Sequence, residues 1–429
     1  MKRAFGISRI IGKMTFEFPI RADASLLVGV ALLIAACSRP GSTAGSSALK
    51  PIDQAALQTM VDNMARELLI PGAVILLRTP QGEFTVTYGT TLLGTTTPPR
   101  ADTHFRIASN TKTMTAAVIM QLVQENKLSL DDPLSKYVPG VPNGDNITIA
   151  QLLEMRSGLY NYTYAPEVSA SLDQDPTKVW SPTEVLAIAF AHPPNFPPGT
   201  AFEYCNTNYA LLGLVAEKLD DKPLAACFQE RLFGPLGLKD TLLPASTSNT
   251  LPEPYSHGYM YGGSVFALTD KPYPAELQAA ATAGTLKPTD DTGQNPSYAS
   301  AAGGVISTAN DLATWIQALV GGRVLDADTQ RRWLESPQPE DPKKPDGQQY
   351  GYGITLLRWG ANTLYFHGGE APGFNSFMGY DPASKMTLVV WTNLTVSLDG
   401  KVTANALMLK VLDQIYVVSP LRPSPSPIN

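Results

Sequence analysis

A serine and a lysine three residues apart form the first candidate for catalytic chemistry. Ser109 lies where a strand-like run gives way to a helix-like run, and Lys112 falls on the same face of that helix. A serine hydroxyl becomes a good nucleophile only when a base removes its proton. A buried lysine can serve as that base, because burial disfavours the charged amine. The alternative is a purely structural role, with a helix-capping serine and a surface lysine.

A tyrosine and an asparagine two residues apart form the second candidate. A tight loop can point the side chains of Tyr204 and Asn206 into one cleft. A phenol can pass a proton to a leaving group when a nearby cation lowers its pKa. The alternative is an interface tyrosine followed by a helix-capping asparagine.

The third candidate is His367-Gly368-Gly369, followed by Pro372-Gly373. Glycines at a strand end let a substrate backbone approach closely, and a strand edge can offer a backbone N–H to an oxyanion. The alternative is a turn beside a solvent-exposed histidine. The sequence contains neither HExxH nor CxxC nor clustered His/Asp spacing, so we expect no metal site and no other cofactor.

Hydrophobic periodicity indicates the elements that must position these motifs. Helical patterns cover residues 54–69, 111–125, 208–219, 222–233 and 402–417. Strand-like runs cover residues 73–78, 84–88, 364–367, 376–380 and 387–391. The segment from 355 to 362 reads as a link between strands. The terminal strands should meet in one sheet, with a helical insertion between them and the active site between the two lobes.

Residues 1–36 are predicted to be a lipoprotein signal peptide. Basic residues precede an apolar run, 26–36, that is too short to span a bilayer and ends in Ile34-Ala35-Ala36-Cys37. This ending resembles a bacterial lipobox, in which Cys37 becomes the lipid-bearing residue. Residues 37–50 then form a flexible tether, and the protein is expected to be exported and lipid-anchored to the cell envelope. A plain signal peptide is the alternative, and the long basic lead leaves open a start at Met14 instead of Met1.

The other two cysteines are predicted to be free thiols. Cys205 lies at the start of one predicted helix and Cys227 about one turn into its antiparallel partner. A rise of about 1.5 Å per residue separates them by roughly 15 Å. A disulfide needs Cα atoms within about 7 Å.

Composition limits the class of protein. The chain has 429 residues, of which 44% are hydrophobic and 16% charged, as expected for a globular protein and not for a disordered one. The net charge of −6 argues against a nucleic-acid partner. We expect a monomer with a small-molecule or peptidoglycan-peptide substrate, a folded domain over residues 51–418, and a Pro/Ser tail over 419–429.

In their order, the three motifs resemble those of the penicillin-recognising serine enzymes, in the branch of class C β-lactamases, serine D-alanyl-D-alanine carboxypeptidases and related esterases. The resemblance spans about residues 55–415 and is closest to the actinomycete carboxypeptidase type. Other segments similar to family signatures are residues 152–159, 198–199, 235–238, 302–308 and 350–353.

The resemblance implies an α+β fold of the β-lactamase/transpeptidase type. An antiparallel sheet flanked by helices is expected from residues 51–115 and 297–418, beside an all-helical region of residues 116–296. No Gly-x-Ser-x-Gly motif supports a classical α/β-hydrolase instead.

The resemblance also implies acyl transfer through an acyl-enzyme at Ser109. Lys112 and Tyr204 share the base and acid roles, and either can be the first base. The implied catalytic residues are Ser109, Lys112, Tyr204 and His367. The implied substrate- and oxyanion-binding residues are Asn206, Gly368, Gly369 and Glu370, with backbone N–H groups of Ser109 and Glu370 as oxyanion donors.

Two departures from the family pattern bear on the substrate. His367 stands where β-lactamases carry the lysine of Lys-Thr-Gly, which disfavours a fast β-lactamase. Thr355 stands where the carboxypeptidase type has an arginine for the substrate carboxylate, so Arg358 is the remaining candidate. The alternative is that Arg358 is a solvated loop charge and that the substrate needs no such partner. The expected substrate is a D-alanyl-D-alanine peptide, an ester or a related amide, with β-lactams as acylating ligands. The alternative is a weakly catalytic penicillin-binding or cell-wall-binding lipoprotein.

Overall fold

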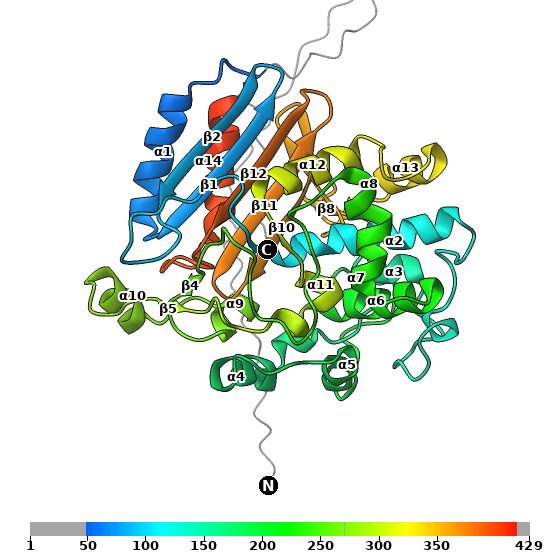
Figure 1. Cartoon of the computed structure of the whole chain (residues 1–429). Coiled ribbons are helices and arrows are strands. Elements are labelled where there is room, and N and C mark those ends of the chain that lie inside the picture. Colours follow the sequence, from blue (N-terminus) through cyan, green and yellow to red (C-terminus); the bar gives the residue numbers. More distant parts are fainter. Residues whose placement is uncertain (1–48, 270, 418–429) are drawn as a thin grey trace, which may run out of the picture. The chain divides into compact units, whose positions relative to one another are not determined.

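The computed structural model describes residues 49–269 and 271–417 (Figure 1). The predicted signal peptide, Cys37 and the 419–429 tail lie outside the described residues. Lys50, at the end of the predicted tether, is bound to the C-terminal helix: its backbone N–H donates to Ile415 O at 2.8 Å and its Nζ to Asp413 O at 2.9 Å.

An eight-stranded antiparallel sheet forms the centre of the fold, in the order β2-β1-β12-β11-β10-β9-β8-β7. β1, whose sequence is rich in Val, Ile and Leu, pairs on one side with its hairpin partner β2 and on the other with the C-terminal β12. This pairing confirms that strands from the two ends of the chain meet. The bounds are β1 Gly72–Thr79, β2 Gly82–Gly89, β7 Gln338–Pro339, β8 Gln349–Tyr350, β9 Thr355–Trp359, β10 Asn362–Ala371, β11 Phe374–Asp381 and β12 Met386–Thr392.

β9 corrects the interpretation of residues 355–362 as a link. Thr355–Trp359 is a strand paired with β10, and only Gly360 and Ala361 turn the chain. Gly360 has a φ of +63°, which a two-residue hairpin turn requires. The exposed Arg358 interrupts an otherwise apolar run and hides the strand pattern.

Helices cover both faces of the sheet. α1 (Gln54–Glu67) and α14 (Thr403–Ile415) lie side by side on one face, and α12 (Ala309–Val320) packs on the other (Figure 1). Side chains of β1 alternate between two cores: Val74 and Leu76 join the α12 side, whereas Ile75 and Leu77 join the α1 and α14 side.

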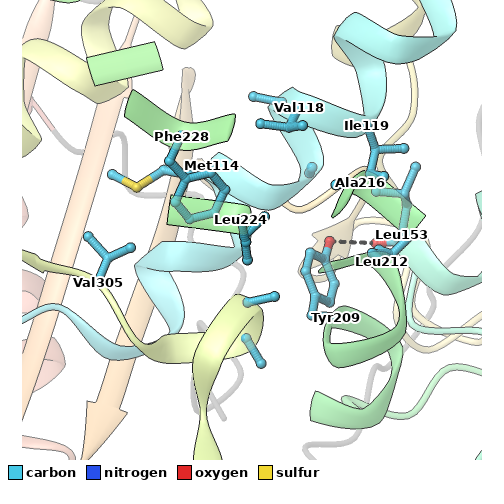
Figure 2. Close-up of a cluster of buried hydrophobic side chains, with 14 of the residues drawn as sticks. Met114, Val118, Ile119, Leu153, Tyr209, Leu212, Ala216, Leu224, Phe228 and Val305 are labelled. Atoms are coloured by element: carbon cyan, nitrogen blue, oxygen red, sulfur yellow. Dashed lines mark hydrogen bonds between the residues drawn. The ribbon is translucent and has the colours of Figure 1, made fainter. Parts of the chain in front are cut away.

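The helical region beside the sheet is organised by α2 (Thr111–Gln124) and α6 (Asn206–Asp220), which pack directly against each other. Figure 2 shows the apolar contact between them, which α7 (Leu224–Phe228) completes. In the same cluster Tyr209 donates a hydrogen bond to Leu153 O at 3.0 Å. This packing sets the relative position of the two helix N-termini.

The other helices and turns are shorter. They are α3 Ile149–Leu153, α4 Pro166–Gln174, α5 Pro182–Phe190, α8 Gly234–Leu236, α9 Val265–Thr269, α10 Ala275–Thr282, α11 Ser300–Gly303 and α13 Ala327–Leu334, with the single 3₁₀ turns η1 Ala108–Asn110, η2 Leu134–Lys136, η3 Tyr162–Tyr164 and η5 Pro296–Tyr298 and the π-helix η4 Gln229–Phe233.

Two small sheets stand outside the main one. β3 (Phe105–Arg106) pairs with β6 (Ile306–Ser307) just before the serine motif. β4 (Tyr259–Met260) pairs with β5 (Thr289–Asp290) inside the region expected to be all helical. Tyr259 N–H also donates to Gly373 O and Asn393 O, at 3.1 and 2.9 Å, so this part of the insertion lies against the main sheet.

Cys205 and Cys227 are buried free thiols, which confirms the prediction from helix geometry. Within the residues that the structure describes, no helix is long and apolar enough to cross a bilayer.

Candidate active site

Ser109 lies in the turn η1, between β3 and the first residue of α2. Ala108 has a φ of +48°, a left-handed conformation that a non-glycine residue rarely adopts. Asn110 stabilises the turn, since its Nδ2 donates to Ile107 O at 3.1 Å and to Ser376 Oγ at 2.8 Å. The turn is therefore tied to β11, and the half-buried Ser109 stands at a helix N-terminus.

Lys112, one turn along, is completely buried. Its Nζ lies 2.9 Å from Ser109 Oγ, 2.6 Å from Asn206 Oδ1 and 2.7 Å from Ala302 O. Burial holds the pKa of Lys112 well below its usual value of 10.5. No carboxylate lies among these three partners, so none of them offsets the burial that disfavours the ammonium form.

Tyr204 lies beside the same amine. The Nζ of Lys112 is 4.8 Å from the centre of the Tyr204 ring. The segment is held from behind by Met155, whose sulfur accepts from Cys205 N–H at 3.3 Å. Asn206 is the first residue of α6, so the contact between α2 and α6 brings the serine motif and the tyrosine motif together.

His367 of β10 faces Tyr204 at 6.3 Å between ring centres. Its Nδ1 is 2.6 Å from Gly368 O, which can only accept, so Nδ1 carries the hydrogen. Its Nε2 then accepts from the buried Tyr350 hydroxyl at 3.1 Å. Burial lowers the pKa of His367 to about 3. The imidazole is therefore neutral, and both ring nitrogens have protein partners.

The two glycines of β10 differ in their surroundings. A Cβ on Gly369 would lie 2.1 Å from Ile107 O, so only glycine fits between β10 and the serine turn. A Cβ on Gly368 would meet nothing closer than 3.8 Å. β9 pairs with β10 only as far as Phe366, so the β10 residues that follow Phe366 are not paired with β9 along this edge. Alternation along the ladder is expected to turn the N–H of Glu370 to that edge, near Ser109.

Arg358 lies outside this cluster. Its side chain is 54% exposed, and its nearest carboxylate is Asp346 at 3.9 Å. On β9 it pairs with Thr363, four residues before His367. Thr355 is buried and carries no charge. The suggestion that Arg358 binds a substrate carboxylate is therefore not supported.

The structure brings Ser109, Lys112, Tyr204, Asn206 and the His367–Glu370 segment together, as expected from the motifs. It adds four groups that the motifs did not assign: Asn161, Thr163, the Ala302 carbonyl and the Tyr350 hydroxyl. Ala302 and Tyr350 belong to segments that resemble family signatures, which was the available signal. In the described part of the chain, no group of three or more His, Cys, Asp and Glu residues is arranged to hold a metal ion.

This fold and this cluster of residues are those of the penicillin-recognising serine hydrolase family. The chain matches the family described as Beta-lactamase over residues 57–413, and it belongs to that family.

Solved structures with this fold include a D-stereospecific amidohydrolase from Streptomyces sp., with 30% identity, a TM-score of 0.71 and coverage of 84% of this chain and 98% of that chain. The D-amino acid amidase from Ochrobactrum anthropi SV3 shows 28% identity and a TM-score of 0.70, covering 84% and 97%. An octameric penicillin-binding protein homologue from Pyrococcus abyssi, at 24% identity and a TM-score of 0.68, shares the fold; the match covers 84% of this chain and 77% of that chain.

Among curated relatives, a D-aminopeptidase from Brucella anthropi is 27% identical over 329 residues, which cover 76% of this chain and 56% of the relative. Protein flp of Staphylococcus aureus is 26% identical over 354 residues, covering 80% and 63%. The chain thus spans about three fifths of the length of these relatives.

Proposed function

We propose that the protein hydrolyses amides or esters of D-amino acids through an acyl-enzyme at Ser109. The observation that carries the proposal is the buried Lys112 amine, 2.9 Å from Ser109 Oγ at a helix N-terminus. The names of the related amidohydrolase, amidase and aminopeptidase support the substrate class.

In the acylation step, Ser109 gives its proton to neutral Lys112 while Oγ attacks the substrate carbonyl carbon. Backbone N–H groups of Ser109 and Glu370 stabilise the resulting oxyanion. As the bond to the leaving group breaks, Lys112 returns the proton to the leaving nitrogen or oxygen, directly or through Tyr204. A water molecule then attacks the ester at Ser109 by the same route, releasing the acid and regenerating the hydroxyl.

The electrostatics favour a substrate without a free carboxylate. An ionised carboxylate is costly to bury without a cationic partner. His367 is neutral with both nitrogens occupied, Thr355 is uncharged, and Arg358 points to solvent. These features favour amides and esters over peptides ending in D-alanyl-D-alanine. β-Lactams remain proposed acylating ligands because they share the acyl-transfer chemistry.

We further propose that the protein acts at the cell envelope as a lipoprotein anchored through Cys37. The support is the signal-like sequence that ends at this cysteine. A monomeric state also stays a prediction.

The test is covalent labelling by a fluorophosphonate or a penicillin probe, with the modified residue identified by peptide mass spectrometry. The wild type should be labelled at Ser109, and Ser109→Ala should lose both labelling and turnover of a D-amino-acid amide. Retained turnover in Ser109→Ala overturns the assignment. Labelling without turnover indicates a penicillin-binding protein with weak catalysis.

A further inference from the structure

Two buried side chains behind the catalytic cluster are bonded to Asn206. Asn161 caps the turn η3, and Thr163 lies within it. Asn161 is 1% exposed and Thr163 4%. The three residues form an unbroken chain of hydrogen bonds that ends at the amine of Lys112.

The direction of every hydrogen bond in this chain can be assigned. Asn161 Oδ1 faces the backbone N–H of Asn206 at 3.1 Å and that of Thr163 at 3.4 Å, and backbone N–H groups can only donate. This atom is therefore the amide oxygen. It also accepts the hydroxyl hydrogen of Thr163, with Oγ1 at 3.0 Å.

The Thr163 hydroxyl has one hydrogen, and that hydrogen is committed to Asn161. Toward Asn206 it can only accept, so the Asn206 group 3.1 Å away must be the NH2 of its amide. The amide oxygen of Asn206 consequently faces Lys112, with Oδ1 2.6 Å from Nζ. Rotating the amide by half a turn would set its oxygen against the accepting Thr163 oxygen and its NH2 against a hydrogen of Lys112.

At Lys112 this orientation determines where the lone pair can point. Asn206 Oδ1 and Ala302 O are both acceptors, so each takes one hydrogen of the amine. A neutral amine has only two hydrogens, which leaves its lone pair for the third partner, Ser109 Oγ at 2.9 Å. We infer that Thr163 is a positioning residue whose hydroxyl fixes the Asn206 amide and thereby aims the lone pair of Lys112 at Ser109.

This inference rests on the proposed function, in which Lys112 takes the proton of Ser109. Without the Thr163 hydroxyl, the Asn206 amide can rotate and present its NH2 to Lys112. The neutral amine would then accept from Asn206 and turn its lone pair away from Ser109. The ammonium form would lose an acceptor and meet a donor, so the pKa of Lys112 should fall further.

The experiment measures the rate of fluorophosphonate labelling at Ser109 as a function of pH in the full-length protein. Thr163→Val should lower the maximal rate by at least about tenfold, the scale of a misdirected catalytic group, and move the acidic limb of the profile to lower pH. Thr163→Ser, which keeps the hydroxyl, should have the same maximal rate as the wild type and an acidic limb at the same pH.

Thr207→Val is the matched control. The Thr207 hydroxyl donates to Tyr160 O at 2.7 Å and accepts from Tyr162 N–H at 3.2 Å, so it holds the same loop without touching the Asn206 amide. This variant should leave the acidic limb in place. The ionisable groups near Lys112, namely Tyr204, Cys205, Tyr209 and His367, are unchanged in all variants.

An unchanged profile in Thr163→Val overturns the inference, and so does an equal shift in Thr207→Val, which would indicate loop packing. If the valine variant does not fold, Thr163→Ala serves in its place, and the ¹³Cε shift of Lys112 reports the amine's pKa without any probe. A wild type that is not labelled at Ser109 overturns the proposed function instead, so the two failures are distinguishable.

Discussion

The side chains of Lys112, Asn206 and His367 have hydrogen-bond partners whose donor and acceptor roles can be assigned. Burial lowers the pKa of the Lys112 amine, which has no carboxylate among its hydrogen-bond partners, and two fixed acceptors orient it. The imidazole of His367 is also oriented by fixed partners, since its two ring nitrogens are hydrogen-bonded to a carbonyl and a phenol. The chemistry proposed for this site therefore depends more on the orientation of hydrogen-bonding groups than on charged side chains.

Lys112 and Tyr204 should behave as one catalytic unit. We expect Lys112→Ala and Tyr204→Phe each to reduce turnover by about 10² or more, the scale of general acid–base catalysis. The double variant should lose much less than the product of the two effects, because the two groups serve one proton path. The measurement is kcat for the four proteins on one amide substrate. Fully multiplicative losses would show that the two residues act independently.

His367 should make the protein sensitive to acid. Its folded-state pKa is about 3, against 6.5 for an ordinary imidazole. Between these values the unfolded chain binds a proton that the folded protein does not, so stability is full above pH 6.5 and is lost as the pH falls. One pKa unit corresponds to about 1.4 kcal/mol, so the free energy of unfolding should fall by about 2–3 kcal/mol between pH 6.5 and 4.5.

Denaturant unfolding at a series of pH values checks this expectation. His367→Gln has no titrating ring, so its stability should vary less with pH over the same range. Equal pH dependence in the two proteins would assign the acid sensitivity to other groups.

The sequence identified the residues that carry chemistry but not those that orient them. Ser109, Lys112 and Tyr204 stand in recognisable motifs, and the structure brings them together. Thr163 acts only through its position in three dimensions, and nothing in the local sequence distinguishes it from an ordinary core residue. Tyr350 lies in a segment similar to a family signature, but the motif alone did not assign its hydroxyl to His367. For Arg358 the sequence left two roles open, a partner for a substrate carboxylate and a solvated charge, and its exposed position favours the second.

At the scale of elements, β10 connects the sheet to the serine turn. Gly369 lets this strand pass the carbonyl of Ile107, which belongs to the turn that carries Ser109. The same strand holds His367 and offers its edge to the substrate. Small shifts of β10 should therefore alter both the oxyanion donor and the imidazole.

Gly369→Ala should be strongly destabilising, whereas Gly368→Ala should not. The added methyl would lie 2.1 Å from Ile107 O at Gly369 but no closer than 3.8 Å to any neighbour at Gly368. Overpacking of this kind costs about 1–3 kcal/mol, and it should also displace β10 from Ser109. The free energy of unfolding of the two variants is the measurement. Similar values for both would contradict the close contact.

Element prediction from sequence succeeded where patterns were long. The hairpin of β1 and β2 and the strands β10 to β12 fall where alternation and β-branched residues indicated them. β4 and β5 were missed because two residues carry no periodicity, and their pairing depends on distant segments of the chain. β9 was missed because the exposed Arg358 made a strand resemble a loop.

At the scale of the whole molecule, catalysis depends on joining distant parts of the chain. Ser109 and Lys112 come from the N-terminal part, Asn206 from the helical region, and His367 from the C-terminal strands. The sheet closes this arrangement because β1 pairs with β12. The helical region brings Asn206 next to Lys112 through the contact of α6 with α2 (Figures 1 and 2). In the proposed function, substrate choice therefore depends on residues from all three parts of the chain.

The cleft should prefer short esters to peptides that end in D-alanyl-D-alanine. Such a peptide brings a carboxylate whose desolvation needs a cationic partner, most often a bidentate arginine. Thr355 stands where that arginine would be, and Arg358 is exposed beside Asp346. We expect kcat/KM for a nitrophenyl ester of a short acid to exceed that for a D-alanyl-D-alanine tripeptide by at least about tenfold, because losing one good ionic contact has this effect.

Arg358→Ala is the control for this comparison. Because the Arg358 side chain is 54% exposed, its removal should leave the rates on both substrates unchanged. The opposite result would be that the wild type hydrolyses the tripeptide faster than the ester, and that Arg358→Ala loses this preference while its ester turnover stays intact. This result would show that Arg358 reaches the substrate. The protein would then be a carboxypeptidase. In that case the Arg358 side chain would move from solvent to the substrate on binding and would supply the cationic partner that the substrate carboxylate needs.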